Sequence, residues 1–197
     1  MTKNRQTKAV SVAALAGNPN VGKSTIFNAL TGMRQHTGNW PGKTVSLAQG
    51  VCMYKGEEIR LVDLPGTYAL VSKSQEETLA AGFISGGEAD CVIAVCDATS
   101  LERSLILALQ VMELTDRVIV CVNLMDEARK QGIEIDLAAL SFELGVPVVA
   151  ASASREEGMG ELLEQLRRIL DGFEAPRPRR CGVVPDSIRE SHLGAEA

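Results

Sequence analysis

The chain has 197 residues, of which 45% are hydrophobic, so it is long enough to form one domain with a full buried core. Its formal net charge of −5 and pI near 5.2 argue against the broad basic surface that neutralises nucleic-acid phosphates, and we expect no nucleic-acid partner. The apolar stretches are interrupted well before the roughly 18 residues that cross a bilayer, so we expect no membrane span in this chain.

The N-terminal region leads into a first predicted strand. Met1 to Lys8 is basic and polar and runs directly into a strand and a glycine loop, so it lacks the form of a signal peptide. A cytoplasmic location is therefore expected. Ala9 to Ala16 is an apolar run of strand length, and Thr25 to Thr31 has the character of the first turns of a helix.

The segment between this strand and this helix fits the phosphate-binding pattern of glycine, four variable residues and then Gly-Lys-Ser. Gly17 and Gly22 let the backbone curl so that N–H groups point inward, and the helix N-terminus adds partial positive charge. We expect Lys23 to reach the β- and γ-phosphates and the Ser24 hydroxyl to ligate Mg²⁺. The predicted nucleotide-binding residues here are Gly17, Asn18, Pro19, Asn20, Val21, Gly22, Lys23, Ser24 and Thr25.

The next segment predicts a loop and a hairpin. Met33 to Pro41 is polar and contains glycine, which is typical of a functional loop. Thr44 to Tyr54 alternates between apolar and polar residues, and Lys55-Gly56 resembles a tight turn before the strand Glu58 to Val62. We therefore expect Thr44 to Tyr54 to be an antiparallel strand at the edge of the sheet.

A second box follows this hairpin. Asp63-Leu64-Pro65-Gly66 comes directly after a strand, which places a carboxylate at the sheet edge where Mg²⁺ and the γ-phosphate would lie. We expect Asp63 to hold the shell of the metal and the Gly66 N–H to approach the γ-phosphate. By itself this tetrapeptide indicates only a turn, but after a phosphate loop it indicates a nucleotide-sensitive switch.

Three further apolar runs complete the predicted sheet: Ala89 to Val95, Arg117 to Val122 and Pro147 to Ala151. Helical segments alternate with them, and Thr99 to Glu102 resembles a capping box before one of these helices. The pattern predicts an α/β fold with a mostly parallel six-stranded sheet, one antiparallel edge strand and helices on both faces. Cys91, Cys96 and Cys121 lie in strand-like runs, and we expect them to be buried hydrophobic residues.

The ends of the last two strands carry the residues expected to bind a base. Asn123-Leu124-Met125-Asp126 closes one strand, and Ser152, Ala153 and Ser154 follow the other. A carboxylate at Asp126 accepts from both N1–H and the exocyclic amine of guanine, whereas adenine offers no such pair of donors. Guanine is therefore favoured, although an Asp here could also cap the following segment.

The C-terminal region changes in composition. Gly158 to Leu170 has leucines at helical spacing, but after Asp171-Gly172 the chain becomes rich in arginine and proline and then polar. We expect residues 1–172 to form the globular domain and residues 173–197 to form a flexible tail.

With these boxes in order, the chain resembles the P-loop GTPases, and further residues resemble the cytosolic G domain of the ferrous iron transporter B (FeoB) family. The similar stretches are Gly38 to Val45, Asp63 to Tyr68, Asp97 to Arg103, Asn123 to Ala128, Gly132 to Asp136 and Leu144 to Val148. Together they indicate similarity from about Val10 to Leu170.

The resemblance implies several site roles that the residues alone do not show. Thr44 would ligate Mg²⁺ with Ser24 and Asp63, and Gly42 and Lys43 beside it would belong to the GTP site. Asn20 would ligate an activating K⁺ that supplies positive charge where other GTPases use an arginine finger. Thr67 stands where many GTPases carry a water-orienting glutamine, so we expect slow hydrolysis, with Asn20, Lys23, Thr44 and Gly66 as the catalytic groups. Leu124 replaces the usual lysine of the base box, which predicts modest affinity.

These features predict a Mg²⁺-dependent GTP-binding and GTP-hydrolysing switch that regulates ferrous iron uptake, together with a membrane iron-transport component in cis or in trans. Two alternatives remain open. The chain could be an adaptor that binds GTP without hydrolysing it, or a ribosome-assembly GTPase, although the acidic composition disfavours ribosome assembly. No residue is an evident Fe²⁺ ligand.

Overall fold

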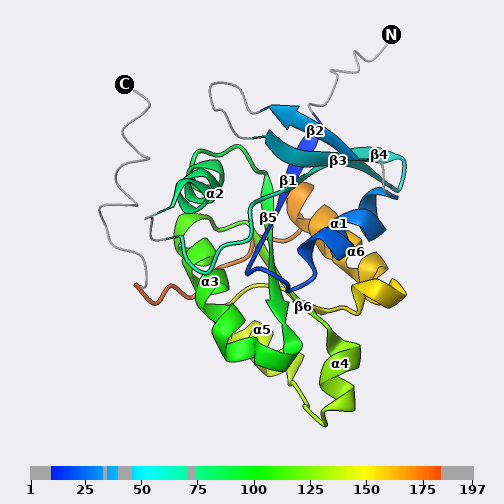
Figure 1. Ribbon diagram of the computed structural model, residues 1–197, viewed down its shortest axis with the longest axis vertical. Helices are drawn as coiled ribbons and strands as arrows, with labels where there is room; N and C mark the ends of the chain where they lie inside the picture. Colours follow the sequence, from blue (N-terminus) through cyan, green and yellow to red (C-terminus); the bar gives the residue numbers. More distant parts are fainter. Residues whose placement is uncertain (1–9, 33–34, 40–45, 71–73, 183–197) are drawn as a thin grey trace.

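The structure is a computed structural model that describes residues 10–32, 35–39, 46–70 and 74–182. Within these residues the strands form one sheet in the order β2-β3-β4-β1-β5-β6-β7 (Figure 1). They are β1 (Ser11–Gly17), β2 (Gln35–Asn39), β3 (Ser46–Tyr54), β4 (Glu57–Asp63), β5 (Cys91–Asp97), β6 (Val118–Asn123) and β7 (Val148–Ala150). Strands β4, β1, β5, β6 and β7 are parallel, and β3 is antiparallel to both of its neighbours. The predicted α/β fold is confirmed.

Strand β2 lies where the sequence predicts a loop. It pairs antiparallel with β3, from Gln35 opposite Gly50 to Asn39 opposite Ser46. The six predicted strands are all present, but β3 is the second strand from the edge rather than the edge itself. An edge strand needs only backbone hydrogen bonds to one neighbour, and the polar sequence of β2 has no apolar alternation that would identify it.

The turn between β3 and β4 has the geometry that the sequence predicts. Tyr54 pairs with Glu57, so the loop contains only Lys55 and Gly56. Both have positive φ, 49° for Lys55 and 82° for Gly56, as a two-residue hairpin turn of the primed type requires. This turn precedes β4, whereas the glycine loop follows β1, which is parallel to β4. The turn and the glycine loop therefore lie at opposite ends of the parallel strands.

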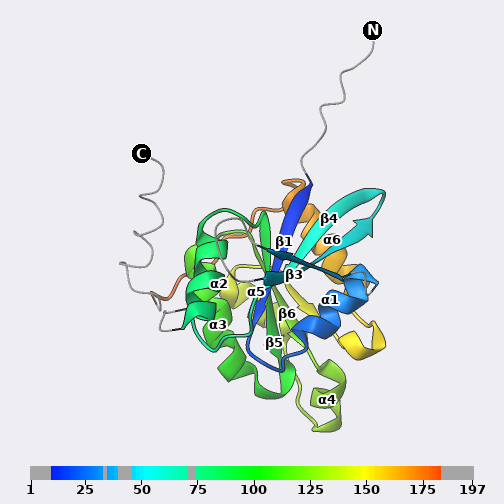
Figure 2. The ribbon, with the colours of Figure 1, turned by 45° about the horizontal axis from the view of Figure 1, so that its top comes forward.

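Two layers of helices cover the sheet (Figures 1 and 2). The helices are α1 (Lys23–Thr31), α2 (Gln75–Ser85), α3 (Leu101–Leu114), α4 (Met125–Lys130), α5 (Leu137–Leu144) and α6 (Met159–Leu170). Alternate residues of β1 face the two layers: Ala14 and Ala16 pack with α2 and α3, whereas Ala13 and Leu15 pack with α1 and α6. A central strand buried on both faces is therefore apolar at every position, which explains its continuous hydrophobic run.

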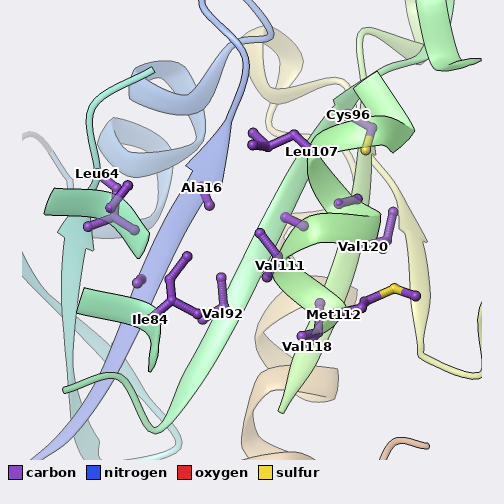
Figure 3. Close-up of a cluster of buried hydrophobic side chains, with 14 of the residues drawn as sticks. Ala16, Leu64, Ile84, Val92, Cys96, Leu107, Val111, Met112, Val118 and Val120 are labelled. Atoms are coloured by element: carbon purple, nitrogen blue, oxygen red, sulfur yellow. The ribbon is translucent and has the colours of Figure 1, made fainter. Parts of the chain in front are cut away.

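The core under α3 shows how the helices hold the sheet. Leu107, Val111 and Met112 of α3 pack against Val92 and Val118 of neighbouring strands (Figure 3). Each of these five side chains is at most 3% exposed. Burial of an aliphatic side chain of this size stabilises a fold by about 1.5–3 kcal/mol.

The start of α3 differs from the predicted capping box. A short 3₁₀ turn, Ala98–Ser100, precedes the helix, and Ser100 at the N-cap makes no side-chain cap bond. Instead the Thr99 amide donates to the Asp97 carboxylate at 2.7 Å. Asp97 takes the capping role because it ends β5 and is held at the point where the chain turns into the helix.

Residues 173–182, which we call the C-terminal strap, make defined contacts, although the sequence predicts a flexible tail from residue 173. The amides of Arg177 and Arg179 donate to the carbonyls of Gly145 and Leu144, both at 2.9 Å. The amides of Cys181 and Gly182 donate to the Glu113 carboxylate at 2.8 and 2.6 Å. Backbone hydrogen bonds of this kind are independent of hydrophobic side chains, so composition did not reveal them. The rest of the predicted tail lies outside the described residues.

The cysteines of the central strands are placed as the sequence predicts. Cys91, Cys96 and Cys121 are buried in the sheet as free thiols, as predicted. No helix among the described residues combines the length and the apolar composition needed to cross a membrane.

Candidate functional site

The glycine loop between β1 and α1 lies at the carboxyl edge of the parallel strands, closely packed against its neighbours. A Cβ on Gly17 would lie 2.7 Å from the Val95 carbonyl oxygen, and one on Gly22 would lie 2.3 Å from Nδ2 of Asn123. Gly22 also has φ of 86° and forms the N-cap of α1. Only glycine fits both positions, and the loop is therefore held with its backbone curled around the helix N-terminus.

Asn123 holds this loop through its side chain. Its Nδ2 donates to the Val21 carbonyl at 3.0 Å, and its Oδ1 accepts from the Ala153 amide at 3.0 Å. The side chain is 1% exposed. Asn123 therefore connects the glycine loop after β1 with the turn after β7 and fixes the distance between them.

A charged cluster lies at the mouth of the glycine loop. Nζ of Lys23 is 3.0 Å from Oδ1 of Asp63, and both side chains are close to nine-tenths buried. The Ser24 hydroxyl donates to Oδ2 of Asp63 at 3.1 Å. A cation, a hydroxyl and a carboxylate thus meet at one point, although they come from two elements about 40 residues apart in the sequence.

This cluster fits a magnesium ion. Mg²⁺ prefers hard oxygen donors, and the Ser24 hydroxyl and Asp63 carboxylate are such donors in direct contact. The other predicted ligand, Thr44, lies outside the described residues, as do Gly42 and Lys43. Within the part of the chain that the structure describes, no three His, Cys, Asp or Glu side chains form a group that could hold a metal ion.

The loop after Asp63 packs directly on the glycine loop. A Cβ on Gly66 would lie 3.2 Å from Cα of Pro19, and the Thr67 amide donates to the Gly17 carbonyl at 3.3 Å. Thr67 is 6% exposed. This loop therefore packs on the first residues of the phosphate pattern, Gly17 and Pro19.

The same loop is attached to α3 at two points. The Leu70 amide donates to Oε1 of Gln110 at 2.7 Å in a buried bond, and the Tyr68 ring lies 4.8 Å from the Arg103 guanidinium. Neither Gln110 nor Arg103 was predicted to contact this loop, because helical positions that serve a loop carry no local pattern.

The corner assigned to the base is formed by the segments after β6 and β7. Leu124 has a φ of 64°, and the Met125 amide donates to the Ala151 carbonyl at 3.1 Å, so the two segments are joined. Asp126 is 9% exposed, and its Oδ1 is buried without a hydrogen-bond partner among the described residues. A buried acceptor of this kind suits a ligand that carries donors.

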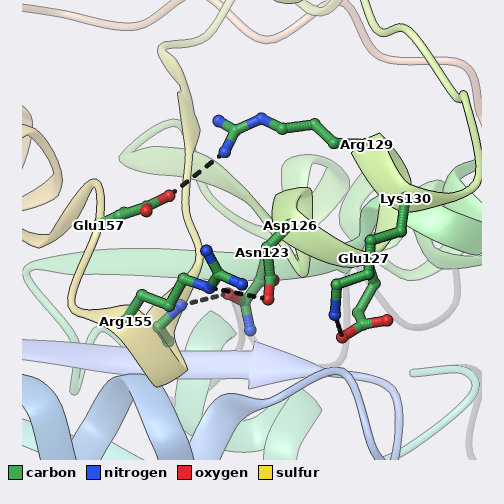
Figure 4. A network of polar contacts seen from close by, with 8 residues as sticks. Asn123, Asp126, Glu127, Arg129, Lys130, Arg155 and Glu157 are labelled. Atoms are coloured by element: carbon green, nitrogen blue, oxygen red, sulfur yellow. Dashed lines mark hydrogen bonds and ion pairs between the residues drawn. The ribbon is translucent and has the colours of Figure 1, made fainter.

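Arg155 shares this corner, although it was not among the predicted site residues. Its Nε lies 3.3 Å from Oδ2 of Asp126 (Figure 4). Ser152 and Ala153 are buried, while Ser154 is exposed. The only sequence signal was its position directly after the predicted base-binding stretch.

Asn18 and Asn20 differ in their surroundings. Asn18 is 5% exposed and its Oδ1 is buried without a hydrogen-bond partner in the described part of the chain. Asn20 is exposed and has a φ of 67°, a conformation that Asn tolerates better than most residues. This geometry suits a loop-forming residue and also leaves the Asn20 side chain accessible to an ion, so its predicted role stays a prediction.

Comparison with known proteins gives consistent matches. Residues 11–166 match the FeoB_N family model, Ferrous iron transport protein B. The Fe(2+) transporter FeoB of Escherichia coli K12 is 44% identical over 165 residues, which cover 82% of this chain and 21% of that protein. The chain thus spans about a fifth of the length of this curated relative.

Solved structures give the same result. The cytosolic domain of the T. maritima FeoB iron transporter in a GDP form superposes with a TM-score of 0.81 at 43% identity, covering 86% of this chain and 67% of that one. The separate G domain of the same transporter superposes with a TM-score of 0.75 at 45% identity, covering 81% of this chain and 98% of that one.

Proposed function

Because this chain belongs to the ferrous iron transport protein B (FeoB) family, we propose that it is a GTP-binding and GTP-hydrolysing switch domain that regulates ferrous iron uptake. The observation that carries the proposal is the meeting of Lys23, Ser24 and Asp63 at the glycine loop, with Asp126 at the same edge of the sheet. Lys23 would bind the phosphates of one guanine nucleotide, Ser24 and Asp63 would hold its metal ion, and Asp126 would bind its base.

The phosphates would lie in the curled backbone between Gly17 and Ser24. Consecutive N–H groups and the N-terminus of α1 favour anions there. Lys23 adds a full positive charge, which is paired with the Asp63 carboxylate in this structure. Ser24 and Asp63 would hold Mg²⁺, with Thr44 as the third protein ligand. A Mg²⁺ ion held there would supply positive charge beside the phosphates.

Hydrolysis would rely on backbone groups more than on a side-chain base. The Gly66–Thr67 backbone packs on the glycine loop, and the Thr67 side chain is mostly buried. Backbone N–H groups aimed at the attacked phosphate stabilise charge in the transition state. Without a glutamine to orient water, slow intrinsic turnover is expected, and K⁺ held by Asn20 would supply additional positive charge.

The domain would act with a membrane iron-transport component, in cis or in trans, from the cytosolic face of the membrane. The matched relatives are Fe(2+) transporters, and the matched solved structures are cytosolic and G domains of FeoB. A change in residues 63–70 after hydrolysis would alter the surface that this component contacts.

The test is phosphate release from GTP with Mg²⁺ present, in KCl and in NaCl of equal ionic strength. We expect release that is faster in KCl, and we expect Lys23→Ala to abolish it in both salts, which excludes a contaminating GTPase. Asn20→Ala should remove the potassium stimulation while nucleotide binding persists. Nucleotide binding without hydrolysis in either salt would favour the adaptor function, and co-sedimentation with ribosomes would favour ribosome assembly.

A further inference from the structure

The corner assigned to the base contains an ion pair on its solvent side. Nε of Arg155 lies 3.3 Å from Oδ2 of Asp126, and the side chains are 54% and 10% exposed, respectively. The guanidinium therefore covers a nearly buried carboxylate from outside. In Figure 4 the Arg155 side chain reaches across toward Asp126, with Asn123 beside them.

The two oxygens of Asp126 are not equivalent. Oδ2 is paired with Arg155, whereas Oδ1 is buried and has no hydrogen-bond partner among the described residues. Guanine offers two adjacent donors, N1–H and the exocyclic amine, and a carboxylate accepts from both most directly with one oxygen for each donor. With Arg155 in this position, only Oδ1 is ready to accept.

We propose that Arg155 competes with guanine for Asp126, and that its guanidinium must leave Oδ2 before the base is read by both oxygens. The proposal rests on the guanine-nucleotide binding proposed for this site. Arg155 is then a specificity-determining residue: its pairing lowers the affinity for guanine nucleotides and weakens the preference for guanine over a purine with a single donor.

The surrounding loop allows the side chain to move while the backbone stays in place. The backbones of Ser152 and Glu157 bond to each other in both directions, at 3.1 and 3.3 Å, and the Arg155 amide donates to the Ser152 carbonyl at 2.9 Å. The neighbouring carboxylate of Glu157 is paired with Arg129 at 3.3 Å. Rotation of the half-exposed Arg155 side chain into solvent therefore needs no change in the loop.

The exposure of the Arg155 side chain determines how large a change in nucleotide affinity we expect. Ion pairs that are partly open to solvent change equilibria by about 1.5- to 5-fold, because water screens the attraction. Arg155→Gln should therefore bind GDP about 1.5- to 5-fold more tightly than the unsubstituted protein. Inosine diphosphate lacks the exocyclic amine and needs only Oδ1, so its affinity should stay the same and the preference for GDP over it should increase.

The experiment is calorimetric titration of the full chain with GDP and with inosine diphosphate, for the unsubstituted protein, Arg155→Gln, Arg155→Lys and Arg129→Gln. Arg155→Lys retains the positive charge and should remain close to the unsubstituted protein. Arg129→Gln removes the same charge from the neighbouring ion pair and should change neither affinity. Thermal unfolding without nucleotide checks that every variant is folded.

Unchanged GDP affinity in Arg155→Gln would overturn the proposal. Weaker binding of both nucleotides would also overturn it, because Arg155 would then attract or contact the nucleotide rather than compete with it. If the unsubstituted protein bound no guanine nucleotide, the proposed function would fail and this inference with it, so the two failures are distinguishable.

Discussion

Two side chains three positions apart, one at the end of β6 and one in the first turn of α4, have different roles. Asn123 is 1% exposed and joins the glycine loop to the turn after β7 through two hydrogen bonds of 3.0 Å. Asp126 makes one ion pair with a half-exposed arginine and keeps its other oxygen unpaired among the described residues. One motif therefore contains a structural brace and a group available to a ligand.

This difference predicts different consequences of substitution. Asn123→Ala leaves the Val21 carbonyl and the Ala153 amide buried without this partner, which should lower the free energy of unfolding by about 2–4 kcal/mol. Asp126→Ala should change that free energy by less than about 1 kcal/mol but should remove most of the preference for GDP over ADP. Urea unfolding and calorimetric titration measure the two quantities.

The two variants serve as controls for each other. Asn123→Ala should mainly change the free energy of unfolding, and Asp126→Ala should mainly change the preference for GDP over ADP. If Asp126→Ala kept the full preference for GDP, the base assignment would be wrong. If Asn123→Ala unfolded at the same urea concentration as the unsubstituted protein, the two bonds would contribute little to stability.

At the scale of elements, helix α3 holds two segments that are distant in the sequence. Gln110 accepts from the Leu70 amide at 2.7 Å, and Glu113, one turn further along, accepts from the amides of Cys181 and Gly182. Glu113 is 5% exposed although it is charged. A carboxylate at this depth is stabilised by such backbone donors, and it orders the C-terminal strap in return.

Glu113→Ala should therefore loosen the C-terminal strap. Trypsin cleavage after Arg179 and Arg180 should become faster, by roughly 5- to 150-fold if about 1–3 kcal/mol of local stability is lost. The measurement is the rate of appearance of the truncated chain in native buffer.

Glu143→Ala is the matched control. Glu143 also meets the strap, through Arg179 at 3.4 Å, but its side chain is 69% exposed. An exposed pair of this kind contributes little, so the cleavage rate should change by less than about threefold. Equal cleavage rates for the Glu113 and Glu143 variants would contradict the anchoring role of Glu113.

At the scale of the whole molecule, the two helix layers exclude water from the sheet and determine the chemistry of its thiols. Burial raises the pKa of Cys91 and of Cys96 to about 12, and it also raises the pKa of Cys52 and of Cys121. Cys181 on the strap is exposed. Because the thiolate is the reactive form, a raised pKa and a closed core both protect the four buried residues at ordinary pH.

We therefore expect one of the five cysteines to react with Ellman's reagent at pH 8 in the folded protein, and all five after unfolding in guanidinium chloride. Raising the pH to 9 should leave the folded count at one, since this pH is still well below a pKa of about 12. Cys181→Ser should reduce the folded count to zero. Rapid reaction of two or more thiols in the folded protein would show that the core opens readily.

The fold and the separate motifs of the site were predictable from local patterns, because each strand, helix and motif is formed by residues that are close together in the chain. The alternation of strands and helices follows from hydrophobic periodicity, and Lys23, Ser24 and Asp63 were recognisable because a glycine loop and a strand end constrain their neighbours. Even the hairpin turn at Lys55-Gly56 carried its own signal.

The remaining features depend on contacts between distant segments. Strand β2 forms because β3 offers it a free edge, the C-terminal strap is held by Glu113 about 68 residues away, and Arg155 reaches Asp126 across two loops. Backbone hydrogen bonds and ion pairs of this kind have no periodicity along the chain. Local patterns therefore predicted the architecture and the glycine-loop motif, whereas contacts between distant segments fix what braces the site, what covers the corner assigned to the base and how residues 173–182 are held.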